Sequence, residues 1–155
     1  MISTSRGLAT MAVAFGVIAA VCASPVSSAD TTEPTPPPAP ALDTGALAAL
    51  IPAPPNSEPG GPDTIPNGGI HMHFKANGGP NATLAAYKAA LEQKGWDVTT
   101  IVSSTGDSGG GGTYTGTNGD AYGVFDGGGF NTTTYIDVCA WPTKPDEPNC
   151  TRGGR

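Results

Sequence analysis

Apolar and polar residues alternate along residues 69–75. The apolar positions are Ile70, Met72 and Phe74, and the polar positions are His71, His73 and Lys75. A period of two is typical of a strand with one buried face. The pattern therefore predicts a strand whose apolar side meets the core and whose two histidines lie on the other side.

After Gly78-Gly79-Pro80, the apolar residues recur every three or four positions, as in a helix. Asn81 can cap a helix that runs to Lys94, and Gly95 suits the left-handed conformation that often follows a helix end. Trp96 then falls where it can pack back on the helix. The apolar stripe of this helix consists of Leu84, Tyr87, Ala90 and Leu91, a spacing that predicts burial of one face against a sheet.

Further strands alternate with glycine-rich turns after the helix. The dipeptide Asn118-Gly119 is a strong hairpin signal, and it sets Tyr114 opposite Gly123. A strand, a helix and a strand in succession favour parallel pairing of the first two strands. The expected strands are 97–104, 113–117, 120–125 and 132–141, and the expected glycine turns are 106–112 and 126–129.

These elements predict an α+β domain with two layers, in which one helix packs on a mostly antiparallel five-stranded sheet. The element order is β-α-β-β-β-β. We expect the domain to span residues 67–155 and to end in a strap closed by a disulfide. Apart from Cys22 near the N-terminus, the chain has two cysteines, Cys139 and Cys150. Two cysteines left in a protein outside the cytoplasm are expected to form a disulfide.

Two segments precede this domain. Residues 1–29 read as a signal peptide, with Arg6 before an apolar stretch and Ser27-Ser28-Ala29 as the cleavage site, so that the mature chain begins at Asp30. A lipid anchor on Cys22 and a retained membrane tether are the alternatives. Residues 30–66 are rich in proline and predict a disordered linker. Within it, Asp43 to Ile51 can form one or two helical turns, too short to be stable alone. If this segment is ordered, we expect Leu47, Leu50 and Ile51 to dock onto another part of the protein.

The Ala-rich signal followed by a Thr, Ala and Pro-rich segment resembles exported proteins of mycobacteria and related actinobacteria. The resemblance covers residues 1–66 and rests on composition. It implies a secreted or cell-envelope location, and Thr31, Thr32 and Thr35 resemble the acceptors of O-linked mannose in such proteins. Residues 67–155 resemble no characterised family.

Charge narrows the choice of partner. Removal of Arg6 with the signal leaves 6 of the 7 basic residues against 13 acidic ones, a formal net charge of −7. This balance disfavours nucleic acid and anionic membrane surfaces. After signal removal no apolar run is long enough to span a membrane. The expected partner is an envelope glycan or another exported protein.

One catalytic motif invites comparison. Gly106-Asp107-Ser108-Gly109-Gly110 resembles the segment around the nucleophile of chymotrypsin-type serine proteases, and His71 or His73 and Asp97 precede it in that family's order. The domain is too short for two barrels, however, and a helix separates the histidines from Asp97. We therefore expect no protease.

Strand parity places five side chains on the sheet face opposite the helix. They are His71, His73, Tyr135, Asp137 and Trp141. His71, His73 and Asp137 could share a metal ion, but a solvated strand face is the favoured interpretation, and we expect no catalytic residue, metal or cofactor. The five residues predict a ligand site of a non-enzymatic binding protein; a small secreted metal-dependent or serine hydrolase is the alternative. A structural alternative is that the proline-rich linker or the C-terminal strap covers the aromatic rings.

Overall fold

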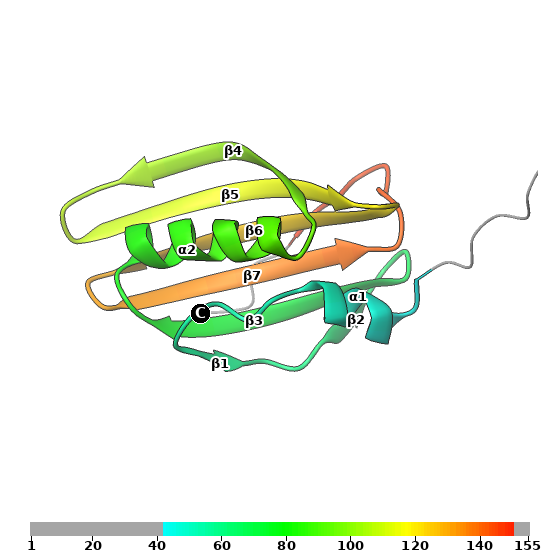
Figure 1. The fold of residues 1–155 in the computed structure, drawn as a ribbon, viewed down its shortest axis with the longest axis horizontal. Helices are drawn as coiled ribbons and strands as arrows, with labels where there is room; N and C mark the ends of the chain where they lie inside the picture. Colours follow the sequence, from blue (N-terminus) through cyan, green and yellow to red (C-terminus); the bar gives the residue numbers. More distant parts are fainter. Residues whose placement is uncertain (1–41, 151–155) are drawn as a thin grey trace, which may run out of the picture. The chain divides into compact units, whose positions relative to one another are not determined.

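The computed structural model describes residues 42–150. The expected signal peptide, the threonines at 31, 32 and 35, residues 30–41 of the expected linker and residues 151–155 lie outside this range. The elements are α1 (Thr44–Leu50), β1 (Ser57–Pro59), β2 (Asp63–Ile65), β3 (Gly69–Asn77), α2 (Pro80–Gln93), β4 (Asp97–Thr105), β5 (Gly109–Asn118), β6 (Ala121–Phe130) and β7 (Thr133–Trp141) (Figure 1).

The strands form one sheet in the order β1-β3-β7-β6-β5-β4, with β2 also paired to β3. Every strand pairing within residues 42–150 is antiparallel. The expected α+β class and mostly antiparallel sheet are confirmed, and the elements from β3 onward follow the predicted order. In the part of the chain that the structure describes, the sheet has seven strands instead of five, and there are two helices instead of one.

The expected parallel pairing of the first two strands is wrong. In the sheet order β7, β6 and β5 lie between β3 and β4. The reason is that β7 pairs along almost the whole of β3, from Ile70 opposite Ala140 to Asn77 opposite Thr133. The last strand of the domain therefore occupies the place beside β3, and α2 crosses the sheet to β4.

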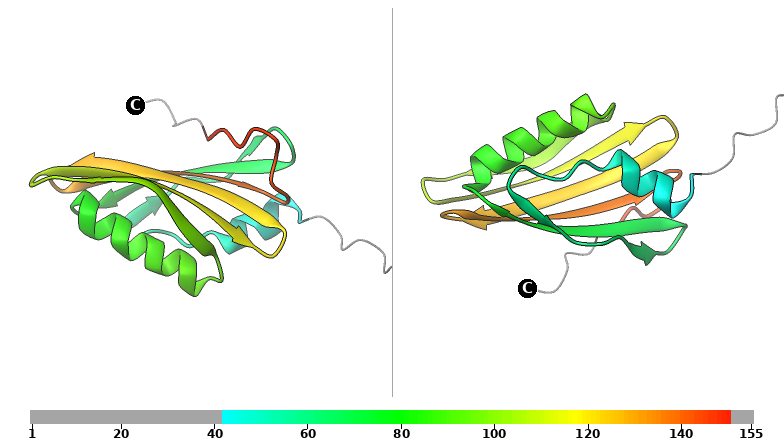
Figure 2. Two further views of the ribbon diagram at one scale, coloured as in Figure 1. Left: turned by 90° about the horizontal axis from the view of Figure 1, so that it is seen from above. Right: turned by 60° about the horizontal axis from the view of Figure 1, so that its bottom comes forward.

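Both helices lie on one face of the sheet (Figure 2, left). The stripe of α2 packs against the apolar side of the strands, as its spacing predicts. The fully buried residues of this core include Phe74, Tyr87, Leu91, Phe125, Ile136 and Val138. The helix end also follows the prediction, because Gly95 has a φ of 93° and the Trp96 amide donates to the Leu91 carbonyl at 3.1 Å.

The expected capping role of Asn81 is wrong. The helix begins at Pro80 after Gly79, which supplies no side-chain cap. Proline suits a first helical position because its missing N–H would have no partner in the helix. Asn81 lies inside the first turn, and its Nδ2 donates to the Gly106 carbonyl at 3.2 Å. It therefore ties the start of α2 to the β4–β5 turn.

The disordered linker is wrong for residues 42–66. Asp43 caps α1 by accepting from the Ala46 amide at 2.7 Å. Leu47 is fully buried in the main core, and the Trp96 Nε1 donates to the Leu50 carbonyl at 2.9 Å. Strands β1 and β2 pair with the outer edge of β3. Burial of a few apolar side chains stabilises a helix that is too short alone.

The expected glycine turns are only partly confirmed: residues 106–108 form the β4–β5 turn, whereas residues 109–112 and 126–129 belong to strands. Gly110, Gly111 and Gly112 of β5 lie opposite Gly129, Gly128 and Gly127 of β6. The hairpin loop is Gly119-Asp120, since Asn118 pairs with Ala121. Tyr114 therefore faces Phe125, and Gly123 faces Gly116. The close approach of α2 explains why some of these strand positions are glycines. A Cβ at Gly127 would meet the Leu84 side chain, and a Cβ at Gly110 would meet the Asn81 side chain.

The predicted disulfide is confirmed. Cys139 on β7 is bonded to Cys150, and their Cα atoms are 5.5 Å apart. Residues 142–150, which we call the strap, lie on the sheet face opposite the helices (Figure 2, left). That face, which we call the open face, is therefore covered at one end.

Candidate functional site

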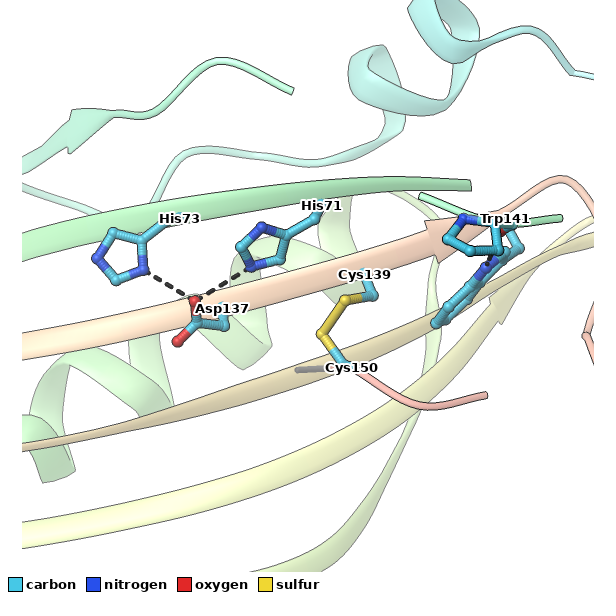
Figure 3. Close-up of a disulfide and its surroundings, with 7 residues drawn as sticks. His71, His73, Asp137, Cys139, Trp141 and Cys150 are labelled. Atoms are coloured by element: carbon cyan, nitrogen blue, oxygen red, sulfur yellow. Dashed lines mark hydrogen bonds and ion pairs between the residues drawn. A yellow bond between two sulfur atoms is a disulfide. The ribbon is translucent and has the colours of Figure 1, made fainter. Parts of the chain in front are cut away.

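The predicted site residues lie on the open face, as their parity requires. His71 and His73 come from β3, and Tyr135, Asp137 and Trp141 come from the adjacent strand β7. Figure 3 shows both imidazole rings pointing toward the Asp137 carboxylate, with Cys139 and Trp141 farther along the same strand. Antiparallel pairing sets His73 directly opposite Asp137. The sheet thus assembles three of the five predicted residues into one cluster.

Asp137 holds both histidines through one oxygen. His73 Nδ1 lies 2.9 Å and His71 Nε2 lies 3.2 Å from Asp137 Oδ1. When the carboxylate is ionised it can only accept hydrogen bonds, and each ring then takes the tautomer that donates through the nitrogen named and keeps its other nitrogen for a further partner. Asp137 is 1 % exposed, whereas the His73 side chain is 39 % exposed. His73 therefore presents its remaining nitrogen toward solvent.

A second buried carboxylate, Asp126 of β6, lies beside the first. It is paired directly with Asp137 across the β6–β7 ladder and is 7 % exposed. Thr113 Oγ1 donates to its Oδ1 at 2.7 Å. The resulting polar row of His73, Asp137, Asp126 and Thr113 crosses four neighbouring strands. Two adjacent carboxylates with little solvent are costly unless donors surround them, and the histidines and the threonine supply such donors.

Trp141 is not an exposed binding residue. It is 3 % exposed, and its Nε1 donates to the Pro66 carbonyl at 3.1 Å. The ring packs at 6.5 Å from that of Tyr122. A small second core forms there on the open face, from Val124, Cys139 and Trp141 with Ile65, Tyr122 and Cys150 against them. Trp141 therefore follows the alternative in which the linker and the strap cover the aromatic ring, because β2 and Cys150 of the strap pack on it at this end of the face.

The protease-like motif does not assemble a catalytic triad. Ser108 lies in the β4–β5 turn, and Asp97 begins β4 at the other end of that strand. His71 and His73 are on β3, with three strands between β3 and β4. Ser108 instead lines a hollow of about 500 Å³ beside the first turn of α2. Among residues 42–150, no group of three or more His, Cys, Asp or Glu side chains is arranged to hold a metal ion.

A shallow depression of about 470 Å³ lies at the uncovered end of the open face. Its lining residues are Ser104, Gly110, Gly111, Gly127, Gly128, Gly129, Phe130 and Tyr135. Phe130 is 65 % exposed. Tyr135 is half-buried and its ring stacks on that of His73, with centroids 5.9 Å apart and planes 25° apart. Tyr135 thus joins the depression to the histidine cluster.

The outward-facing glycines of this depression are Gly111 and Gly128, which we call the glycine floor. A Cβ at either would lie 3.1 Å from a carbonyl oxygen of the neighbouring strand, and the nearest side-chain atom, Ser104 Oγ, would be 3.8 Å from a Cβ at Gly111. Gly111 is half-buried and Gly128 is buried, but unlike at Gly110 and Gly127, a Cβ at these positions would clash with no side chain. Glycine inside a strand often marks a place where a ligand or another backbone approaches closely.

Asp126, Phe130 and the glycine floor were not predicted as site residues. Asp126 and the glycine floor were assigned to turns, in which strand parity has no meaning, and Phe130 was assigned to no element. The signal was available in two glycine runs, 109–112 and 127–129, which lie on either side of the Asn118-Gly119 hairpin at similar distances from it. Folding that hairpin brings the runs together and places Asp126 and Asp137 on the same face.

Comparisons of the chain with protein-family models, with curated proteins and with solved structures found no match. Neither helix within residues 42–150 is long and apolar enough to cross a membrane.

Proposed function

We propose that this chain is an exported, non-enzymatic binding protein that holds an envelope glycan in the depression over the glycine floor. The observation that carries the proposal is the pair of open-face glycines, Gly111 and Gly128, at which an added Cβ would meet only backbone within 3.4 Å, in a depression that Phe130 and Tyr135 also line. Backbone without side chains leaves a flat surface, and flanking aromatic rings can stack on the apolar faces of sugars.

The polar groups around the depression support a glycan over a protein partner. Ser104 lines the depression, and the His73 imidazole stacks on the ring of Tyr135. Sugars carry hydroxyl groups that can form hydrogen bonds with such side chains. A stable protein interface usually buries about 800 Å² on each partner, with an apolar centre larger than two aromatic rings supply. Export is supported by the signal-like residues 1–29 and by the Cys139–Cys150 bond.

The test is a titration of the oxidised protein with soluble oligosaccharides prepared from actinobacterial envelope polysaccharide, followed by amide chemical shifts. Shifts should concentrate at residues 109–112 and 127–135. Phe130→Ala and Tyr135→Ala should each weaken binding about tenfold, a change of about 1.4 kcal/mol. Thr117→Ala is the control, since Thr117 is exposed on β5 outside the lining of the depression. Shifts elsewhere, or equal affinity of all three variants, would contradict the proposal.

A hydrolase is the second candidate, favoured by the bond between His73 Nδ1 and buried Asp137. Such a carboxylate orients a histidine to act as a general base through its other nitrogen. The same oligosaccharides distinguish the two functions. If the protein slowly releases fragments or acyl groups from them, and His73→Gln stops this release, the chain is an enzyme and the first proposal is wrong. Binding without turnover supports the first proposal.

A further inference from the structure

The strap has few attachments to the sheet that it covers. Most of its residues are exposed. Its one backbone hydrogen bond within residues 42–150 is internal, from the Asn149 amide to the Glu147 carbonyl at 2.9 Å. No side-chain hydrogen bond or ion pair joins it to another part of the described chain. Hydrogen bonds therefore hold the strands of the sheet together, but they do not hold the strap.

The bond between Cys139 and Cys150 is the main fastening of the strap. A second contact is the Lys144 ammonium, whose Nζ lies 5.2 Å from the centroid of the Tyr122 ring. Ordering the backbone of several residues costs conformational entropy, and one cation–π contact at an exposed lysine does not offset that cost. The strap should therefore leave the sheet when the disulfide is opened.

Two aromatic rings lie beneath the strap on the open face. The rings of Tyr122 and Trp141 have centroids 6.5 Å apart and planes 34° apart. Trp141 is 3 % exposed and Tyr122 is half-buried. The bond from Trp141 Nε1 to the Pro66 carbonyl belongs to the β2–β3 side and does not involve the strap. Release of the strap would thus expose a pair of rings that other contacts keep in place.

We propose that Tyr122 and Trp141 form a second glycan-binding surface, which the strap covers in the oxidised chain and uncovers when the Cys139–Cys150 bond is reduced. The class of ligand rests on the proposed function, whereas release of the strap does not. Neighbouring aromatic rings on a sheet provide the flat apolar area on which sugar rings stack. The rings of Phe130 and Tyr135 have the same role at the other end of the face.

The two surfaces lie on one line along the sheet. Tyr135 and Trp141 belong to the same face of β7, and the rise of a strand places them on the order of 20 Å apart. A polymer of several sugar units could occupy both surfaces at once, whereas a short fragment could occupy only one. Simultaneous occupation strengthens binding without any new contact at the depression. Reduction should therefore favour long ligands over short ones.

The sulfur of Cys150 is the point at which a reductant can attack, because Cys150 is half-buried whereas Cys139 is 2 % exposed. The reductant required is a dithiol. Its thiolate bonds to the Cys150 sulfur, and Cys139 leaves as a thiolate and takes a proton. The second thiol of the reductant then attacks its own sulfur in the mixed disulfide and releases Cys150. The dithiol ends as a disulfide, and two electrons and two protons have passed to the cysteines.

The first test measures whether the strap leaves, without any ligand. Acrylamide quenching of tryptophan fluorescence is compared for the oxidised chain and for the chain reduced with dithiothreitol. Reduction should increase the quenching and shift the emission to longer wavelength, because Trp141 becomes exposed. Cys150→Ser should behave like the reduced chain. Lys144→Ala should behave like the oxidised chain, since it removes only the cation–π contact. Unchanged quenching after reduction, or release of the strap by Lys144→Ala, would overturn the proposal.

A variant with one tryptophan separates release of the strap from unfolding. Trp141→Phe leaves Trp96, which is 3 % exposed in the main core, as the only fluorescent indole of the chain. Reduction should leave its quenching and its circular dichroism unchanged. An increase would mean that the whole domain opens when the disulfide is broken, and the strap would then be part of the fold and not a cover.

The second test compares long and short oligosaccharides from the same envelope polysaccharide. Reduction should tighten binding of the long ones about tenfold and leave the short ones unchanged. Adding Tyr122→Ala to Cys150→Ser should remove the gain. Binding at the depression without a gain on reduction would overturn the second surface alone. If no oligosaccharide bound the oxidised chain at the depression, the proposed function itself would be wrong.

Discussion

Glycine residues play two different roles in the paired strands β5 and β6. On the helix side, a Cβ at Gly127 would meet the side chain of Leu84 and lie 3.2 Å from Ile136 Cγ1. On the open face, a Cβ at Gly128 would meet only backbone, at 3.1 Å from the Gly110 carbonyl oxygen. The first glycine is required by the packing of α2, whereas the second leaves the floor of the depression bare.

This difference can be measured with two adjacent alanine substitutions. Gly127→Ala overfills the core and should lower the free energy of unfolding by about 1–3 kcal/mol. Gly128→Ala should cost clearly less, because only a few tenths of an ångström of backbone adjustment are needed, but it should weaken oligosaccharide binding. Urea unfolding of the oxidised variants gives the stabilities. Equal destabilisation by both would show that the two faces are equally constrained.

Tyr87 carries a polar group into the centre of the core. Its side chain is fully buried, and its hydroxyl has no hydrogen-bond partner among residues 42–150. Burial raises the pKa of Tyr87 far above its ordinary value. The unfolded chain therefore ionises first, at about pH 10. The contribution of neutral Tyr87 to stability is complete below that pH and is lost as the pH rises above it.

Replacing Tyr87 by phenylalanine should remove this pH dependence. At pH 7 Tyr87→Phe should be as stable as the unmodified chain or slightly more so, because no hydrogen bond is lost. Between pH 9 and 11 the unmodified chain should lose stability with a slope larger by up to about 1.4 kcal/mol per pH unit. Denaturant unfolding at several pH values gives both slopes. Identical slopes would mean that the hydroxyl is hydrated in the folded state.

At the scale of elements, helix α1 shows how packing stabilises a segment that composition assigns to a linker. It has seven residues, yet Leu47 is fully buried, Ile51 is 7 % exposed, and Trp96 donates to the Leu50 carbonyl. Proline-rich chain on either side does not prevent docking, because the short strands β1 and β2 use only the free edge of β3. The folded unit thus begins before residue 67 and includes α1, β1 and β2.

Leu47→Ala tests whether α1 belongs to the cooperative unit. The substitution empties a buried site between α1 and β3 and should destabilise the whole domain by about 2–5 kcal/mol. Ala49→Ser, at an exposed position of the same helix, should change stability by less than about 0.5 kcal/mol. The two are compared by thermal unfolding followed through Trp96 fluorescence. If Leu47→Ala only loosened residues 42–52, the helix would be an appendage.

At the scale of the whole molecule, the sequence predicts the succession from β3 to β7, the inner faces of β3 and β7, the stop of α2 and the disulfide. Each of these depends on a local signal: alternation, a helical stripe, Gly95 and a cysteine pair. Segments without such a signal were wrongly assigned. Glycine runs show no alternation, so 109–112 and 127–129 read as loops, and prolines obscured the docking of α1, β1 and β2.

The candidate site was likewise predicted only where a local sequence pattern exists. Parity alone brings His71, His73 and Asp137 to one face, and the structure joins them. Burial does not follow from parity, since segments distant in sequence decide it: residues 63–66 and the strap cover Trp141. Asp126 escaped prediction because its role depends on the register of a strand that had not been recognised.

The polar row across the open face has a consequence for how the sheet reaches a unique register. Glycine strands carry few side chains that distinguish one alignment from the next, and a slip by one residue turns every side chain to the opposite face. In β6 such a slip would carry Asp126 away from Thr113 and into the apolar layer beneath Leu84 and Tyr87. A carboxylate without donors is strongly disfavoured there. The buried aspartates thus penalise misaligned sheets, a task that the neighbouring glycines cannot perform.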